Sequence, residues 1–128
     1  MTAKFVPTFV YEFNDENAPE RFLPPGFPYG AAHQSELQYL FGLPTAQFSI
    51  PLSEEQMQLA TDMRRYWSNF AQVGMPSVGG KGQWPRFESE KPRVLSLTTP
   101  MSSVEGDFSE RHQCRFWAQV ESTAHGRN

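Results

Sequence analysis

The chain has 128 residues, a formal net charge of -3 and 20% charged residues, a size that fits one ordinary domain with a real core. The mild acidity and the lack of a Lys/Arg stripe argue against a nucleic-acid-binding protein. No apolar run approaches the ~20 residues that span a bilayer, and the N-terminus holds no sustained apolar segment of the kind that a secretory signal needs.

The first predicted element is a β-strand within residues 5–13, which are rich in aromatic and β-branched side chains. Pro7 would interrupt a sheet ladder, so pairing is expected to start at or after it. Both alternating sets of side chains are apolar until Glu12, which is typical of a strand covered on both faces in a parallel sheet. Such a strand needs parallel neighbours reached by crossovers, and the few residues before it cannot supply one.

Residues 14–29 hold four prolines and Gly26, which exclude regular structure over most of this stretch. A long irregular loop inside a compact domain is usually functional or disordered. Apolar side chains interleaved along the loop favour order, packed against other parts of the chain. These side chains are Phe22, Leu23, Phe27 and Tyr29.

A short amphipathic helix is predicted before Gly42, which would end it. Leu37, Leu40 and Phe41 have the i, i+3, i+4 spacing of one helical face, expected to be the buried one. His33 lies at or just before the first turn of this helix, after the strand and the Pro-rich loop.

A longer helix is predicted from a capping box at Ser53 to about Val73, because Gln56 follows the Ser cap by three residues. Gly74 and Pro76 would terminate it. Its buried stripe is expected to consist of Met57, Ala60, Met63, Trp67, Phe70 and Ala71, widened by Leu59, Tyr66 and Val73.

Residues 77–83 are glycine-rich, but they lack the Gly-x4-Gly-Lys-Ser/Thr pattern of a phosphate-binding loop and no strand precedes them. An exposed turn is therefore expected there. The segment 84–87, Trp-Pro-Arg-Phe, is expected to pack through its aromatic side chains rather than to bind a ligand.

A short strand is predicted at 93–98, with Val94 or Leu95 and Leu97 facing inward. A closing helix is predicted at 108–120, with four apolar residues, Cys114, Phe116, Trp117 and Val120. The small polar tail after Glu121 is expected to fray. Cys114 is the only cysteine, so an internal disulfide is impossible, and a buried small apolar residue is expected there.

Of the three histidines, His112 and His125 are expected to be surface residues of the closing helix and the tail. His33 differs because small residues flank it, which lets backbone and ligand approach closely, and because it follows a strand and a loop. On these residues alone, a structural histidine and a catalytic one both remain open.

No partner for His33 stands out within the chain. Glu36 lies three residues on, but no further ligand cluster accompanies this pair, so no metal site and no cofactor are expected. A serine nucleophile on the turn Gly-x-Ser-x-Gly is absent. The nearest stretch, residues 74–79, has the wrong spacing.

Ten short motifs nevertheless occur in a characteristic order between about residue 8 and residue 120. They are Tyr11-Glu12-Phe13, Asn17-Ala18-Pro19, Gly30-Ala31-Ala32-His33, Ser35-Glu36-Leu37, Tyr39-Leu40-Phe41-Gly42, Tyr66-Trp67, Asn69-Phe70-Ala71, Gly74-x-Pro76, Trp84-Pro85 and Cys114-x-Phe116-Trp117. In order and approximate spacing they resemble the C-terminal part of type B carboxylesterases, the α/β-hydrolases that include the cholinesterases.

The resemblance implies that His33 is the triad histidine of a serine esterase. In these hydrolases the triad order is Ser, then Asp or Glu, then His, so both partners and the oxyanion hole would lie upstream of Met1. Gln34 departs from the family, since many relatives have Gly after the histidine. Glu36 matches a common family acid, for which a structural hydrogen-bonding role is expected.

The fold class that the resemblance implies is α/β: a C-terminal fragment of an α/β-hydrolase fold over residues 1–121, with a flexible tail at 122–128. It would hold the last central strand, the catalytic-histidine loop, the long helix, a short edge strand at 93–98 and the closing helix. The expected partners are a carboxylic ester and the missing N-terminal portion of the same fold, with no nucleic acid and no membrane. If this chain is the whole product, a cytoplasmic location is expected.

The isolated chain is predicted to have negligible esterase activity. Two alternatives remain open. One is a non-catalytic carboxylesterase-like interaction module. The other is a small self-standing binding protein with an apolar pocket under the Pro-rich loop.

Overall fold

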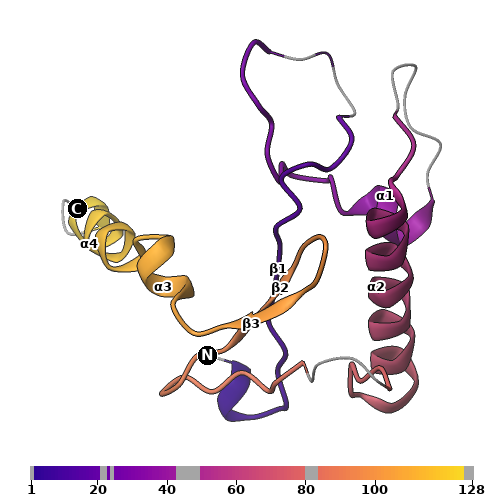
Figure 1. Ribbon diagram of the computed structural model, residues 1–128. Helices are drawn as coiled ribbons and strands as arrows, with labels where there is room; N and C mark the ends of the chain where they lie inside the picture. Colours follow the sequence, from indigo (N-terminus) through magenta and orange to yellow (C-terminus); the bar gives the residue numbers. More distant parts are fainter. Residues whose placement is uncertain (1, 21–22, 24, 43–49, 80–83, 126–128) are drawn as a thin grey trace.

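The structure is a computed structural model that describes residues 2–20, 23, 25–42, 50–79 and 84–125. After a 3-10 turn at Thr2–Lys4, the elements follow one another as strand, two helices, two strands and two helices (Figure 1). Their bounds are β1 Tyr11–Phe13, α1 Leu37–Phe41, α2 Glu54–Val73, β2 Val94–Leu97, β3 Ser103–Glu105, α3 Phe108–Arg111 and α4 Cys114–His125.

The three described strands form one sheet in the order β1-β2-β3. β1 pairs with β2 in parallel, with Tyr11 opposite Leu95 and Phe13 opposite Leu97. The parallel pairing predicted for the first strand is therefore confirmed, but its neighbour lies downstream, after a crossover through α1 and α2. The crossover explains how a parallel strand can stand near the start of the chain.

The prediction of an edge strand at 93–98 is wrong for the described sheet. β2 lies between β1 and β3, and all four of its residues are buried. β3 runs antiparallel to it, with Val104 opposite Leu95. β3 was not predicted, because its three residues, Ser-Val-Glu, are too few to display an alternating pattern.

The long helix is confirmed, with bounds and caps as predicted. Ser53 Oγ accepts a hydrogen bond from the Gln56 N–H (3.2 Å), and Gln56 Oε1 accepts one from the Ser53 N–H (2.9 Å). Gly74 ends α2 at a φ of 71°, in the left-handed region that favours glycine, and its N–H donates to the Phe70 carbonyl.

The buried stripe predicted for α2 is confirmed at Leu59, Ala60, Met63 and Tyr66, but Met57 and Phe70 are exposed and Gln56 is buried in addition. The buried face of α1 differs from the predicted one. In α1 Gln38 and Tyr39 are buried and Phe41 is 69% exposed. In both helices a residue with a polar group turns inward because that group finds a buried hydrogen-bond partner, which apolar periodicity cannot reveal.

The core lies between α2, α1 and the sheet. Leu95 and Leu97 of the sheet pack with Met63 of α2, Tyr39 of α1 and Trp84. The predicted packing of the 84–87 segment is confirmed at Trp84, whose ring contacts Phe9, Tyr11, Tyr66 and Trp67 and whose Nε1–H donates to the Val10 carbonyl (3.0 Å).

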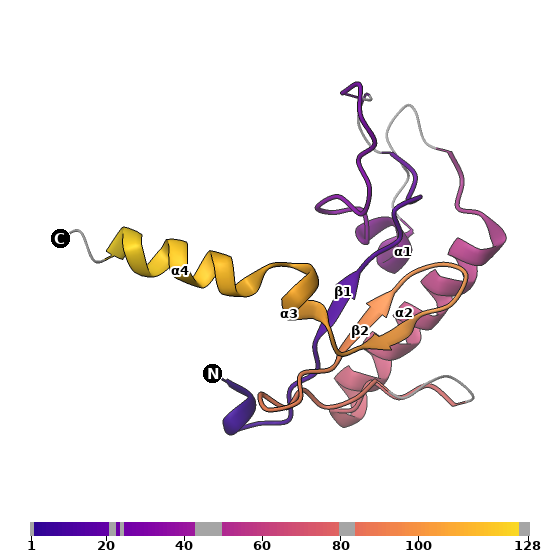
Figure 2. The same cartoon turned by 60° about the vertical axis from the view of Figure 1, so that its left-hand side comes forward.

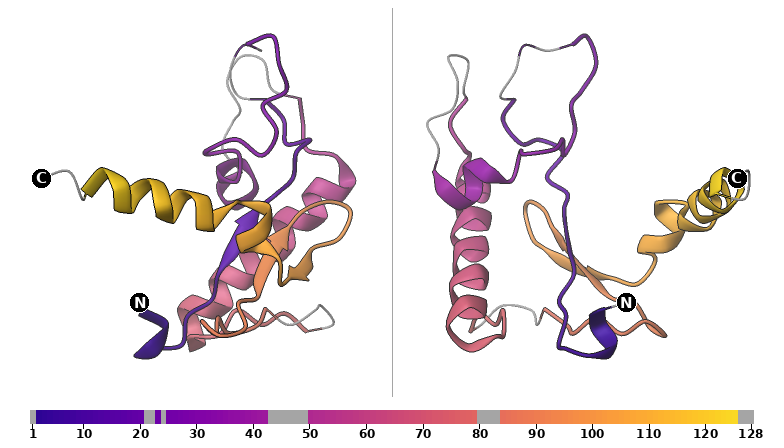
Figure 3. Two further views of the ribbon diagram at one scale, coloured as in Figure 1. Left: turned by 90° about the vertical axis from the view of Figure 1, so that its left-hand side faces the viewer. Right: turned by 180° about the vertical axis from the view of Figure 1, so that it is seen from behind.

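The predicted closing helix is divided into α3 and α4 by His112 and Gln113, the latter at a φ of 50°. α4 continues to His125, beyond the predicted end, and the Ser122 and Thr123 hydroxyls donate back to the Gln119 carbonyl. α4 projects away from the sheet and from α2 (Figures 2 and 3).

Cys114, Phe116, Trp117 and Val120 are exposed on α4, so the expectation of a buried cysteine is wrong. None of the described helices is long and apolar enough to cross a membrane.

Leu23 and Phe27 of the Pro-rich loop are exposed rather than packed, which corrects the prediction for that loop. The Tyr29 side chain is held within the loop, because its hydroxyl donates a hydrogen bond to the Leu23 carbonyl (2.7 Å). Phe22 and most of the glycine-rich turn, residues 80–83, lie outside the described residues.

Candidate active site around His33

His33 lies in the turn that leads into α1, and its side chain is exposed. The turn is held by successive local hydrogen bonds, from the Ala32 N–H to the Gly30 carbonyl (2.9 Å) and from the Ser35 N–H to the Ala32 carbonyl (3.0 Å). Gly30 and Gln34 on either side of His33 both have positive φ, 58° and 73°. The backbone at Gln34 is thus in a conformation that a glycine would adopt without strain.

Within the described residues, neither a nucleophile nor an orienting acid is paired with His33. Among the described residues, none makes a hydrogen bond with its imidazole. Glu36 is the N-cap of α1, and its carboxylate makes no capping bond there. Burial raises the pKa of the Tyr11 hydroxyl, and the negative charge of Glu36 raises it further. The charge of Glu36 is therefore felt at Tyr11 of β1.

A concavity of about 470 Å³ lies beside this turn and is lined mostly by residues of the Pro-rich loop itself. Gly30 is one of its lining residues, which places the concavity next to the segment that carries His33. Its wall is mixed, with two acidic residues and several apolar ones. The lining residues are Glu16, Asn17, Ala18, Pro19, Glu20, Leu23, Pro28, Tyr29, Gly30 and Ile50.

Asp15, which was not predicted as a functional residue, is the most deeply buried charged residue in the described chain, with 1% of its surface exposed. Its carboxylate accepts from the Tyr39 hydroxyl (2.6 Å), Gln56 Nε2 (3.1 Å), the Thr99 hydroxyl (3.2 Å) and the Asn17 N–H (3.2 Å). One side chain thereby joins the end of β1 to α1, α2 and the β2–β3 hairpin. Its position just after a strand was the available signal, because polar groups at strand ends often have specific roles.

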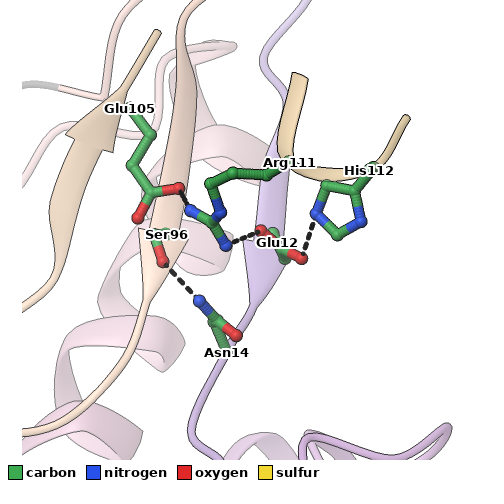
Figure 4. A network of polar contacts seen from close by, with 6 residues as sticks. All are labelled: Glu12, Asn14, Ser96, Glu105, Arg111 and His112. Carbon is green, nitrogen blue, oxygen red and sulfur yellow. Dashed lines mark hydrogen bonds and ion pairs between the residues drawn. The ribbon is translucent and has the colours of Figure 1, made fainter. Parts of the chain in front are cut away.

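A second polar network joins α3 to the sheet (Figure 4). His112 Nε2 lies 2.8 Å from Glu12 Oε1, and an Arg111 nitrogen lies 3.5 Å from Glu12 Oε2. Arg111 also pairs with Glu105 of β3. His112 is at the surface, as predicted, but it is fixed there by the β1 carboxylate and by contact with the Phe108 ring.

The described part of the chain contains no group of three or more His, Cys, Asp or Glu residues that could hold a metal ion. The candidate functional features of the described residues are the open imidazole of His33, the neighbouring concavity and the two carboxylate networks. An imidazole can accept and donate a proton near neutral pH.

Comparison with known proteins gives a consistent result. The sequence model of the carboxylesterase family matches residues 1–117. Carboxylesterase 4A of Bos taurus is 32% identical over 115 residues, which are 89% of this chain and 20% of that protein. Acetylcholinesterase of Bungarus fasciatus is 30% identical over 111 residues, which are 85% of this chain and 18% of that protein. The chain thus spans about a fifth of the length of these curated relatives.

Solved structures of similar shape are also esterases. A thermophilic pNB esterase superposes with a TM-score of 0.67 at 26% identity, covering 87% of this chain and 22% of the other. An esterase from Clostridium hathewayi gives a TM-score of 0.66 at 19% identity, covering 86% and 21%, which is a likeness of fold alone. The chain has a mixed α/β architecture that forms part of an α/β-hydrolase fold.

Proposed function

This chain belongs to the carboxylesterase family, and from that premise we propose that it is the C-terminal segment of a serine carboxylic-ester hydrolase in which His33 is the catalytic histidine. The observation that carries the proposal is the open imidazole of His33, on a turn beside a concavity, without a described hydrogen-bond partner. A satisfied structural histidine would have both ring nitrogens engaged or its ring packed.

In the proposed mechanism, His33 takes the proton from a serine hydroxyl as that oxygen attacks the ester carbonyl. It then returns the proton to the leaving alcohol. An upstream carboxylate would fix the imidazole tautomer, and upstream backbone N–H groups would stabilise the oxyanion. The exposed side of His33 is the side from which these groups would reach it.

The edge of β1 that is unpaired in the described sheet supports the proposal that an upstream portion of the same protein completes the sheet and the catalytic site. β1 contributes a parallel strand, with one neighbour, to the end of the described sheet. In parallel pairing, Glu12 directs its backbone groups to β2, while those of Tyr11 and Phe13 point to the free edge. An added parallel strand there would continue the sheet, as the α/β-hydrolase fold requires.

The test is ester hydrolysis by the full-length gene product with His33→Ala, using a chromogenic short-chain ester. The expected result is a loss of kcat/KM of about 100-fold to 10,000-fold, which is the usual contribution of a general acid–base. The matched control is His112→Ala, because His112 follows α3 and pairs with Glu12 of β1, away from the proposed site. This variant is expected to leave turnover unchanged. Equal activity of wild type and His33→Ala would reject the catalytic role.

The 128-residue chain expressed alone is expected to show negligible turnover of the same ester. The reason is that the described residues place no nucleophile at His33. Turnover by this chain that disappears in His33→Ala would contradict the division of labour while supporting the role of the histidine, so the two parts of the proposal can fail separately.

A non-catalytic interaction module is the second candidate, favoured by the apolar residues that α4 exposes, Phe116, Trp117 and Val120. An inactive full-length product whose self-association depends on these residues would favour the module over the esterase.

A further inference from the structure

We propose that Asp15 is a positioning residue, which fixes the turn carrying His33 by holding the Tyr39 hydroxyl of α1. The inference rests on the proposed role of His33, and it assigns a function to a buried carboxylate outside the site itself. Asp15 does not touch the reacting atoms in this proposal. It acts through Tyr39.

The first support is the unusual environment of the Asp15 carboxylate. All four hydrogen bonds that the described residues give it come from uncharged donors: a phenol, an amide, a hydroxyl and a backbone N–H. A buried carboxylate without a cation is costly unless its oxygens are fully bonded. The donors are supplied by three different elements and by the loop itself, so the arrangement of those elements and the burial of the charge depend on one another.

The second support is that Tyr39 is held on three sides. Its side chain is completely buried. Its hydroxyl donates to Asp15 (2.6 Å), its carbonyl accepts from Arg64 Nη1 of α2 (2.7 Å), and its ring packs edge-on against Phe13 of β1, with centroids 5.0 Å apart. Burial, followed by the bond to Asp15 and its charge, raises the pKa of the Tyr39 hydroxyl, so the hydroxyl stays protonated and remains a donor at neutral pH.

The third support is the short path from Tyr39 to His33. The Tyr39 N–H donates to the Glu36 carbonyl (3.1 Å), and the Leu37 N–H donates to the Gln34 carbonyl (3.2 Å). The turn is thus continuous with α1, whereas on its other side the chain leaves through Gly30 into the Pro-rich loop. A five-residue helix is not stable by itself. The position of His33 therefore depends on what holds α1.

A carboxylate suits this task better than an amide. Asp15 can accept several hydrogen bonds at both oxygens, whereas an asparagine would turn an NH₂ group toward at least one donor. Gln56 lies in the first turn of α2, where the helix dipole favours a nearby negative charge.

The experiment compares Tyr39→Phe and Asp15→Asn in the full-length gene product, with Thr99→Val as the matched control. Thr99→Val removes a different donor from the same carboxylate, but that donor lies in the β2–β3 hairpin and not on α1. Two readouts are made for each variant: the kinetics of ester hydrolysis, and NMR order parameters of the backbone amides of residues 33–36. Tyr39→Phe removes only one hydroxyl, so it keeps the test meaningful if Asp15→Asn does not fold.

The expected result for Tyr39→Phe is a fall in kcat of about 10-fold to 100-fold with KM within about twofold, because a small displacement of a catalytic group slows chemistry more than binding. The order parameters of residues 33–36 are expected to fall from about 0.85 toward 0.6. Thr99→Val leaves the bond between Tyr39 and Asp15 in place and is expected to change both readouts much less than Tyr39→Phe does.

Order parameters that stay at the wild-type level in both Tyr39→Phe and Asp15→Asn would overturn the inference, and so would an equal loss of kcat in the Thr99→Val control. The order parameters do not require catalysis. A mobile turn in Tyr39→Phe together with full activity of His33→Ala would therefore reject the proposed function and leave the positioning role of Asp15 standing.

Discussion

Tyr39 makes the stability of the fold sensitive to alkaline pH. Burial raises the pKa values of the Tyr11, Tyr39 and Tyr66 hydroxyls above the ordinary 10.0. The unfolded chain therefore loses these protons first as the pH rises, so the stabilisation is complete below about pH 10 and declines above it. The urea midpoint is expected to fall above pH 10, and less steeply in Tyr39→Phe. A midpoint independent of pH in the wild type would contradict this.

Trp84 contributes more to stability than its place in a loop suggests. It is 9% exposed, and its ring contacts aromatic side chains from β1, α2 and the segment before β1. Trp84→Ala is expected to lower the free energy of unfolding by about 3–5 kcal/mol. The control is Trp117→Ala on α4, where the ring is 59% exposed and a change within about 0.5 kcal/mol is expected. Denaturant titration of the full-length product measures both.

At the scale of single residues, the sequence indicated His33 but not Asp15. His33 stands in a motif with small flanking residues, which is a local signal. Asp15 is defined by partners up to 84 residues away, such as Thr99, and its position after a strand is only a weak local sign of that role. The prediction that Cys114 is buried was wrong for a related reason. Its apolar neighbours on α4 do not pack against the core of the described residues.

The capping box of α2 gives a prediction at the scale of elements. Ser53 and Gln56 satisfy one another's backbone N–H groups at the N-terminus of this helix. Ser53→Ala is expected to destabilise the protein by about 1 kcal/mol, since it leaves a helix N–H without a partner. Asp107→Ala is the control, because Asp107 caps α3 without a side-chain hydrogen bond and should cost less. Thermal unfolding of both variants decides whether the box matters.

Helix ends and strands were predicted correctly where the residues that determine them lie close together in the sequence. The ends of α2 were predicted correctly, because Ser53, Gln56 and Gly74 act within one helical turn. Its buried face was predicted at Leu59, Ala60, Met63 and Tyr66 but not at Gln56, which turns toward Asp15. The division between α3 and α4 was missed, because Gln113 adopts a positive φ without being Gly or Asn.

At the scale of the whole molecule, α4 predicts how the isolated chain behaves in solution. Its exposed Phe116, Trp117 and Val120 form an apolar face that the described residues do not cover. Such a face promotes association. The isolated chain is expected to self-associate in sedimentation, and Trp117→Ser is expected to shift it toward monomer. Met101→Ser, at an exposed hairpin position away from α4, is the control and should have little effect.

The fold class could be predicted because the family motifs span nearly the whole chain, and it is part of an α/β-hydrolase fold. The order of the strands could not. The edge position of 93–98 was taken from the resemblance, and β3 is too short to show a pattern of its own. The pairing of Tyr11 with Leu95 joins residues that no local pattern connects.

That same pairing has a consequence for biosynthesis. A ribosome releases β1 first and must translate both crossover helices before β2 emerges to meet it. During that interval α2 can form, because its capping residues are local. The backbone of the nascent β1 is not yet paired with β2 and can pair with other exposed segments. Chaperone binding to the nascent chain is therefore expected to be concentrated in that interval and to decline once residue 97 has cleared the exit tunnel.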